Sequence, residues 1–264
     1  VAQDFTVARE WWEKAAAQGH APAQNSLGSL YHNGQGVAQD FTAAREWYEK
    51  AAAQGDAGAQ SNLGILYTHG NGVAQDFTAA REWYEKAAAQ GDANAQRNLG
   101  IMYTNGNGVA QDFTAAREWY EKAAAQGHAG AQNSLGCMHQ NGKGVAQDYT
   151  MARQWYEKAL AQQDGVHFRF NLAFLYLNGL GVNQSSSTAG AHIKKAATLN
   201  QKDFSSAMDY YETEADKGDA NAQHLMGYMF RFGLGVTQND VRARAWYNKA
   251  ADQGNVYAQE ALEN

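Results

Sequence analysis

Small and apolar residues recur at helical spacing along most of this 264-residue chain. In the segment 37–55, Phe41, Ala44, Tyr48 and Ala52 fall three or four residues apart, and most residues between them are polar or charged. This spacing places the apolar residues on one face of an α-helix and the polar residues on the other. The segment is therefore predicted to form an amphipathic helix.

A second apolar stripe follows after a short break. In the same unit it consists of Ala59, Leu63, Leu66 and Tyr67, and the sequence Gly-Asn-Gly at 70–72 closes it. Asn and Gly tolerate the positive φ angles that a tight return loop needs. Each unit is thus predicted to be a helical hairpin with antiparallel helices. We call its two helices, in chain order, the first-type and the second-type helix.

The pattern returns every 36 residues with almost no change. The segments 37–55, 73–91 and 109–127 all read VAQDFTAAREWYEKAAAQG, the segment 1–19 differs from them at two positions, and a looser copy begins at Val145. Such a period is typical of solenoids, in which each unit buries its apolar face against its neighbours. We therefore predict an all-α fold, an α/α superhelical solenoid of antiparallel helix pairs without strands.

Polar residues of the first-type helix agree with this prediction. Asp40 precedes the helix, where its carboxylate can accept hydrogen bonds from the free amides of the first turn. Glu46–Lys50 and Arg45–Glu49 are each four residues apart, so both are predicted to pair on the helix surface.

A glycine lies inside almost every second-type helix. Gly64 is one example, although Gly in a helix interior costs about 1 kcal/mol relative to Ala. The repeated choice of Gly predicts a close approach between helices, where a Cβ would collide. The fifth copy has Ala173 instead, so the contact should tolerate one methyl group there. The equivalent glycines are Gly28, Gly100, Gly136 and Gly227.

An aromatic pair recurs on the first-type helices. Adjacent residues of a helix point about 100° apart, so one ring can pack inside its own hairpin and the other between hairpins. Because the spacing is the same in every unit, we predict that both rings belong to the core, in preference to an aromatic ligand box. The pairs are Trp47–Tyr48, Trp83–Tyr84, Trp119–Tyr120, Trp155–Tyr156 and Trp246–Tyr247.

The period breaks in the second half of the chain. The interval from Val145 to Val182 is 37 residues, and that from Val182 to Val236 is 54, which is one and a half periods. Both Val182–Asn200 and Asp203–Gly218 align with a first-type helix. Two first-type helices are therefore predicted in succession, with no second-type helix between them.

This break divides the chain into regular repeats at 1–181, an irregular half-repeat at 182–218, and a final repeat with the start of a terminal helix at 219–264. In the half-repeat, Ser185–Ser187 replace the Asp-Phe-Thr start and His192 replaces a Trp. These changes predict a helix that begins late or frays at its start, and a partly buried imidazole. The break is either drift that a stable array tolerates or a kink that creates a site, and drift is slightly favoured.

The shared residues form a recognisable pattern, AQ-x-x-LG-x-x-Y-x-x-G-x-GV-x-x-D-x-x-x-A-x-x-WY-x-KAA-x-QG, which runs from Ala59 to Gln90-Gly91. It resembles the Sel-one-like repeat family, relatives of the tetratricopeptide repeats. The resemblance implies an α/α superhelix that acts as an adaptor or scaffold for protein complexes. It favours a bacterial protein, periplasmic or secreted rather than cytoplasmic. One branch of the family carries a disulfide in each repeat, and the single cysteine, Cys137, separates this chain from that branch.

The net charge and the absence of known motifs argue against several classes of partner and activity. The chain has 21 Lys and Arg against 27 Asp and Glu, a net charge of −6, which argues against a nucleic-acid partner. No stretch reaches the roughly 18 apolar residues of a membrane span. The G-x-G pairs fit repeat turns better than a phosphate loop, and the eight His residues lack metal-ligand spacing.

We expect no enzyme activity, metal or cofactor, and we favour a monomer. Because the chain starts at Val1 inside a unit, we expect a truncated or processed end.

Two functions fit these features. The first is a non-enzymatic adaptor that binds a protein or peptide partner in a concave groove. The alternative is an envelope or secreted factor that binds glycan or peptidoglycan fragments, with weak hydrolase activity. A convergent pair of acids in the groove would favour the alternative, and the sequence shows none.

The resemblance to tetratricopeptide arrays places the second-type helices on the concave side. Residues beside their buried stripes should then face the groove, polar at first and aromatic at the end of the chain. We predict a partner held mainly around Phe174, Tyr228 and Phe232, unless the helices near 182–218 or a further repeat cover these rings. The predicted groove residues are Ser26, Ser29, Asn33, Asn62, Ile65, His69, Asn98, Ile101, Asn105, Ser134, Cys137, Asn141, Asn171, Phe174, Asn178, Leu225, Tyr228 and Phe232.

Overall fold

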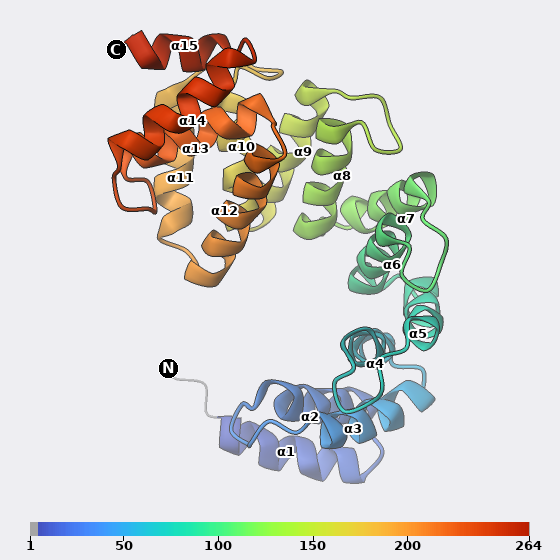
Figure 1. Ribbon diagram of the computed structural model, residues 1–264. Helices are drawn as coiled ribbons and strands as arrows, with labels where there is room; N and C mark the ends of the chain where they lie inside the picture. The colour runs from blue at the N-terminus through green and yellow to red at the C-terminus, as the bar shows by residue number, and fades with distance from the viewer. Residues whose placement is uncertain (1–4, 264) are drawn as a thin grey trace. The chain divides into compact units, whose positions relative to one another are not determined.

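A computed structural model describes residues 5–263 of the chain (Figure 1). Over these residues the chain forms fifteen α-helices and no strand, and neighbouring helices pack in pairs. The prediction of an all-α fold built from helix pairs is confirmed. The helices are α1 Phe5–Ala17, α2 Ala21–Asn33, α3 Phe41–Ala53, α4 Ala57–His69, α5 Phe77–Ala89, α6 Ala93–Asn105, α7 Phe113–Ala125, α8 Ala129–Asn141, α9 Tyr149–Gln162, α10 Val166–Leu177, α11 Ser186–Ala197, α12 Gln201–Asp216, α13 Ala220–Phe232, α14 Asp240–Asp252 and α15 Val256–Glu263.

The helices belong to two compact units, divided between Ala131 and Gln132, inside α8. Through α10 the odd-numbered helices are first-type and the even-numbered helices second-type. By sequence alignment α11, α12 and α14 are first-type, and α13 and α15 are second-type.

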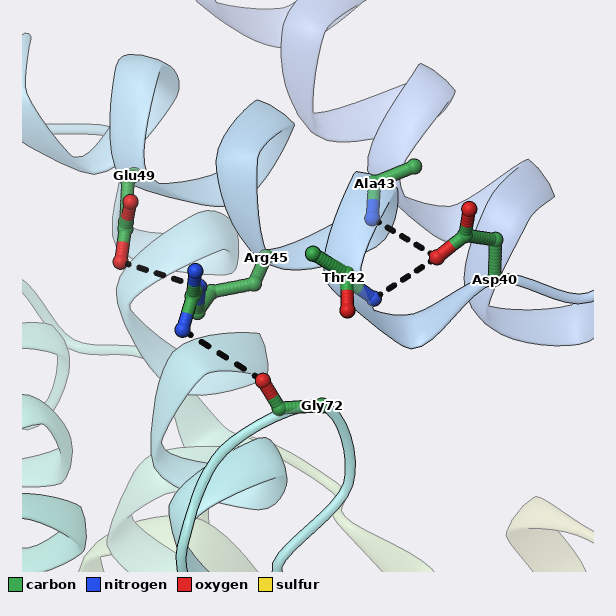
Figure 2. Close-up of polar contacts among 6 residues, drawn as sticks. All are labelled: Asp40, Thr42, Ala43, Arg45, Glu49 and Gly72. Atoms are coloured by element: carbon green, nitrogen blue, oxygen red, sulfur yellow. Dashed lines mark hydrogen bonds and ion pairs between the residues drawn. The ribbon is translucent and has the colours of Figure 1, made fainter.

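The first-type helices α3, α5 and α7 each begin after an aspartate that satisfies their first amides. Asp40 Oδ1 accepts hydrogen bonds from the backbone amides of Thr42 at 2.9 Å and Ala43 at 3.0 Å (Figure 2). Asp76 and Asp112 make the same pair of bonds at the starts of α5 and α7. The capping role predicted for these residues is confirmed.

Arg45 joins its own helix to the loop that closes the same hairpin. Its Nε lies 3.5 Å from Glu49 Oε1, which confirms that predicted pair, and its Nη1 donates to the Gly72 carbonyl at 3.4 Å (Figure 2). The arginine therefore stabilises the α3 surface and also holds the loop that follows α4.

Lys50 does not pair with Glu46 as predicted. Its ammonium nitrogen lies 4.1 Å from the centroid of the Trp47 ring, one turn back on the same helix. Stacking on the indole face gives the cation an attraction that an exposed carboxylate offers only weakly. Lys86, Lys122, Lys158 and Lys249 lie over the equivalent tryptophans in the same way.

The two aromatic residues of each pair pack into different layers of the core. Tyr48 is buried in the core cluster of α3 and α4, whereas Trp47 packs against a different cluster, which α1 and α2 form from Ala16, Ala23, Leu27 and Leu30. This division confirms the prediction that the pair belongs to the core.

The helix glycines face the rings of these tyrosines. A Cβ built on Gly28 would lie 2.5 Å from Tyr48 Cδ1, which is too close for any real contact. The predicted close approach is thus confirmed, and its cause is a ring packed directly on the helix backbone. The same contact joins Gly64 to Tyr84, Gly100 to Tyr120, Gly136 to Tyr156 and Gly227 to Tyr247.

Ala173 stands where the other repeats have this glycine, and the residue at the position of the facing tyrosine also changes. The partner lies 20 residues further along in every pair, and position 193 holds Ile instead of Tyr. Ala173 and Ile193 are both fully buried in the same core cluster. We infer that the extra methyl group is accommodated because the aromatic ring is absent.

A buried glutamine joins successive helices by the same kind of bond in four of the repeats. Gln60, which is 6% exposed, donates to the Ala52 carbonyl of α3 at 3.5 Å and accepts from Gln90, the residue that follows α5, at 2.8 Å. A buried amide is stable only when its hydrogen bonds are satisfied. Gln24, Gln96 and Gln223 occupy equivalent positions and accept from Gln54, Gln126 and Gln253.

The half-repeat begins with a complete helix. Ser185 accepts a hydrogen bond from the Thr188 amide at 3.2 Å, so α11 starts at Ser186, the position equivalent to Phe41. The predicted late start is wrong, because the serine hydroxyl replaces the aspartate as the cap. His192 is half-buried and stacks on Tyr176, with ring centroids 6.0 Å apart, as predicted for the imidazole.

The helices α11 and α12 share between them the contacts of one regular first-type helix. α11 packs against α10 as α3 packs against α2, and α12 packs against α13 as α3 packs against α4. In this second interface Gln223 donates to the Ala215 carbonyl at 2.9 Å. Gly235 faces Phe204, the residue equivalent to the Phe41 that Gly72 faces, although it contacts the ring where Gly72 contacts the backbone and Cβ.

Candidate binding surfaces

Five predicted groove residues lie around two neighbouring cavities on α4 and α6. Asn62, Ile65 and Asn98 line a cavity of about 410 Å³. Ile65 and Asn98 also line a second cavity of about 270 Å³, together with His69 and Ile101. Ile65 and Asn98 therefore contribute to both cavities, while Asn105 is exposed and lines neither of them.

Arg97 also lines both cavities, and we call Asn62, Ile65, Arg97, Asn98 and Ile101 the amide groove. A Cβ on Gly130 would lie 2.7 Å from Arg97 Nε, so a glycine leaves the space that this side chain fills. Burial, and secondarily the charge of Arg97, lowers the pKa of His128.

Arg97 is not among the groove residues predicted from the sequence, although the sequence contains a signal for it. Its position holds an uncharged polar residue in the other second-type helices of the four regular hairpins, namely Asn25, Ser61 and Asn133. A cation at one copy of an otherwise neutral position would have singled it out.

Successive second-type helices are joined by paired asparagines. In the compact unit that ends at Ala131, Asn62 Nδ2 of α4 donates to Asn25 Oδ1 of α2 at 3.0 Å. Among residues 5–263 no hydrogen bond is found to Asn62 Oδ1. The amide therefore keeps an acceptor on the groove side. Of the other predicted residues of α2, Ser26 and Ser29 are half-buried and Asn33 is exposed.

The predicted residues of α8 differ in exposure. Ser134 is half-buried and Asn141 is exposed. The Cys137 thiol lies 3.5 Å from the Tyr156 hydroxyl and 3.7 Å from Asn171 Nδ2, and burial raises its pKa. A buried thiol with a raised pKa is a poor nucleophile.

Four predicted groove residues are buried instead of open. Asn171, Phe174, Asn178 and Leu225 are 7%, 5%, 5% and 0% exposed. This corrects the prediction that they face an open groove and that Phe174 anchors a partner. For Phe174 the cause is α12, whose Tyr211 ring stacks on it with centroids 5.2 Å apart. The alternative that the irregular helices cover these rings therefore holds for Phe174.

Tyr228 and Phe232 remain at the surface, as part of a cleft of about 290 Å³. Their ring centroids are 4.8 Å apart, and Phe232 is 55% exposed. The cleft is completed by His224 from α13 and Tyr257 from α15. We call these four residues the aromatic cleft. The other lining residues are Leu177, Gln184, Ser186, Arg231, Tyr247, Glu260 and Ala261.

Two residues of the aromatic cleft are fixed by hydrogen bonds. The Tyr228 hydroxyl donates to the Ser186 carbonyl at 2.7 Å, which ties α13 to the start of α11. His224 Nδ1 lies 2.8 Å from Asn178 Oδ1, and its ring stacks on Tyr257. Burial lowers the pKa of His224 to about 4, so the imidazole is neutral at pH 7. Phe232 is therefore the residue of the cleft best placed to reorient toward a partner.

These surfaces offer apolar and amide contacts. Within residues 5–263 no group of three or more His, Cys, Asp and Glu side chains is placed to hold a metal ion. Across the same residues, every helix is too short or too polar to cross a membrane. The arrangement is suited to binding by side-chain insertion and hydrogen bonding.

Comparison with protein families gives a match along most of the chain. The Sel1 repeat model matches seven segments, and residues 202–219, which include most of α12, lie outside them. The matched segments are 1–20, 21–56, 57–92, 93–128, 129–164, 167–201 and 220–255. No curated protein matches the chain.

Solved structures with similar folds come from bacteria. A protective antigen of uropathogenic Escherichia coli that displays an SLR fold is 36% identical, with a TM-score of 0.64, over 98% of this chain and 59% of its own. A Sel1 repeat protein from Oxalobacter formigenes is 31% identical, with a TM-score of 0.68, over 92% of both chains. A Sel1 repeat protein from Klebsiella pneumoniae, 20% identical with a TM-score of 0.54 over 78% of this chain and 98% of its own, shares the fold. This chain thus spans little more than half of the antigen.

Proposed function

Because the chain belongs to the Sel1 repeat family, we propose that it is a non-enzymatic adaptor that holds a protein or peptide partner on its second-type helices. Repeats of this family generally act as scaffolds for protein interactions. On this chain the aromatic cleft would bind the protein partner.

The observation that carries the proposal is the exposure of Phe232 beside a preformed cleft. A phenylalanine that is 55% exposed, in contact with a second aromatic ring, leaves apolar surface in water. Aromatic residues beside well-packed pockets contribute most of the binding energy at many protein interfaces. The cleft would take one apolar side chain of the partner, and Phe232 would close over it.

The rim of the cleft adds polar groups that can orient a partner. Arg231, Glu260 and Gln184 line the same cavity. Arg231 Nη1 donates to the Ala261 carbonyl at 2.7 Å, so its position is partly fixed. A polar rim around an apolar centre is the usual arrangement of a protein-binding surface.

Site-specific photocrosslinking tests the proposal. A benzophenone amino acid replaces Phe232 in one variant and Val241 in a control, and both are expressed in the cell that makes the protein. Val241 is 81% exposed on α14 and lies outside the cleft. We expect a discrete protein adduct from position 232 and none from position 241. Equal adducts at both positions, or none at 232, would refute a role for the aromatic cleft.

A further inference from the structure

The extra helix α12 lies on the face of α10 that carries the predicted groove residues. The Tyr211 hydroxyl donates to Asn171 Oδ1 at 2.8 Å, and the Tyr211 ring stacks on Phe174 at an interplanar angle of 30°. All three side chains are buried. The second unit thus contains its own example of a helix bound to a second-type helix through a tyrosine, together with Phe204, whose ring packs edge-on against Phe170 with centroids 5.0 Å apart.

Two of the residues that receive Tyr211, Asn171 and Phe174, have direct equivalents in the amide groove. The third, Phe170, whose ring centroid lies 6.1 Å from that of Tyr211, corresponds to Ser61. Asn171 Nδ2 donates to Asn133 Oδ1 at 2.9 Å, as Asn62 Nδ2 donates to Asn25 Oδ1 at 3.0 Å. Asn171 and Asn62 therefore hold the same structural position. Three residues further along each helix, Phe174 corresponds to Ile65.

On α4 this receiving face is open. Ile65 is only half-buried, and it lines both cavities of the amide groove together with Asn98. The Asn62 Oδ1 atom has no donor among the described residues, whereas Asn171 Oδ1 accepts the Tyr211 hydroxyl. Helix α4 thus presents one hydrogen-bond acceptor and one apolar side chain to the groove, in the spacing that already binds a tyrosine on α10.

Comparison of the repeats shows that the second-type helices carry the variation. The helices α3, α5 and α7 are identical, including exposed residues such as Glu46 and Lys50. Between α4 and α6, by contrast, Ser61 becomes Arg97 and His69 becomes Asn105, and one buried residue also changes, from Leu66 to Met102. Exposure alone does not explain this difference, because the exposed positions of α3, α5 and α7 do not vary. Variation concentrated in one helix type of a repeat array is typical of a binding face.

The positive charge of Arg97 indicates which residues a partner would present beside its tyrosine. Arg97 lines both cavities, and no ion pair to it is found within residues 5–263. A guanidinium in such a position favours a carboxylate on the partner. In α12 the bound tyrosine is followed by Glu212 and Glu214.

We propose that the amide groove binds a helical segment of a partner protein that presents a tyrosine beside carboxylates. The tyrosine hydroxyl donates to Asn62 Oδ1, its ring packs on Ile65, and a carboxylate pairs with Arg97. This site is separate from the aromatic cleft, which would hold an apolar side chain.

A peptide copy of α12 is the direct probe, titrated against the full chain by fluorescence anisotropy. It comprises residues 200–217 and carries a hydrocarbon staple between positions 205 and 209, which are exposed in α12. The staple reduces the ordering cost that keeps so short a peptide largely unfolded. The chain's own α12 already occupies α10, so the amide groove is the receiving face that remains open.

The test variants use residues that other repeats already carry. Ile65→Ser copies Ser29 of α2, and Arg97→Ser copies Ser61 of α4, so both are compatible with the fold. Glu82→Ser, on the exposed face of α5, is the control. We expect Ile65→Ser to weaken binding at least about fivefold and Arg97→Ser about threefold, with a smaller salt dependence. Glu82→Ser should have no effect.

Substitutions in the peptide provide the second part of the test. Replacing its tyrosine, Tyr211→Ala, should weaken binding about tenfold or more, and Tyr211→Phe about fivefold through loss of the hydroxyl bond. No binding at millimolar peptide, or equal binding to the Ile65→Ser chain, would overturn the proposal. Adducts at Phe232 would be unaffected by that result, so the adaptor function would stand without this site.

Discussion

Gly64 packs directly against the ring of Tyr84, with no room for a Cβ between them. In an exposed helix interior, replacing Gly by Ala usually stabilises the protein by about 1 kcal/mol. Here the added methyl group must displace a buried ring. We therefore expect Gly64→Ala to lower the free energy of unfolding by about 2 kcal/mol, measured by urea denaturation.

A double variant identifies the ring as the cause. Gly64→Ala combined with Tyr84→Ile recreates the Ala173 and Ile193 pair of the fifth unit. Tyr84→Ile alone should be destabilising, because it removes the ring and its hydroxyl contact with Thr68 at 3.1 Å. The double variant should lose less stability than the sum of the two single changes. Strict additivity would show that the collision is not what requires glycine.

The Asp40 cap makes a second measurable contribution. Asp40→Ala removes the acceptor for two amides at the start of α3, so we expect a loss of about 1 kcal/mol in unfolding free energy. Asp40→Asn keeps an acceptor oxygen and should retain most of the stability. If Ala and Asn are equally destabilising, the hydrogen bonds are not the source of the effect.

His224 predicts a loss of stability in acid. Its pKa is 6.5 in the ordinary environment and about 4 in the folded chain. Because the unfolded state binds the proton first, stability is unaffected above pH 6.5 and falls as the pH drops from 6.5 towards 4. The expected loss is about 3 kcal/mol over this window.

The matched variant His224→Gln removes this titration and leaves His32, His128 and His192 in place. Urea denaturation of both proteins at pH 7 and pH 4.5 gives the difference that belongs to His224. We expect the variant to lose clearly less stability than the wild type between these pH values. Identical losses would mean that His224 does not control acid unfolding.

Helix α11 is predicted to be less protected from hydrogen exchange than α5. Its start has Ser186 where the regular units have a phenylalanine, so an apolar contact of the first turn is missing. Local opening is easier where few apolar contacts hold a helix end. Amide exchange measured by mass spectrometry should be faster in residues 185–200 than in residues 76–90. Slower exchange at 185–200 would contradict the prediction.

Much of the fold follows from interactions between residues at fixed spacings in the repeat, which can be recognised in the sequence. The Asp40 cap, the Gly64 contact and the placement of Trp47 were all predictable, because each depends on neighbours at a fixed spacing that every repeat shares. The Glu46–Lys50 pair was not, because the competing site for Lys50 is the face of Trp47 on the same helix.

The candidate site was predictable only where the repeat is regular. Asn62, Ile65 and Asn98 lie together because α4 and α6 keep the same register. Phe174 and Asn171 were misplaced because α12 has no counterpart in the regular unit and its Tyr211 covers them. A pattern derived from identical copies cannot show where an additional helix will pack.

The shared role of α11 and α12 has a consequence for how such an array can change in length. Each of the two faces of a first-type helix is recognised independently, one by the helix before it and one by the helix after it. The smallest piece that can enter or leave the chain is therefore a single helix of about half a period, and not a whole hairpin. An insertion of that size leaves both flanking interfaces intact, so lineages of this architecture can acquire a helix with a new sequence without rebuilding the repeats on either side.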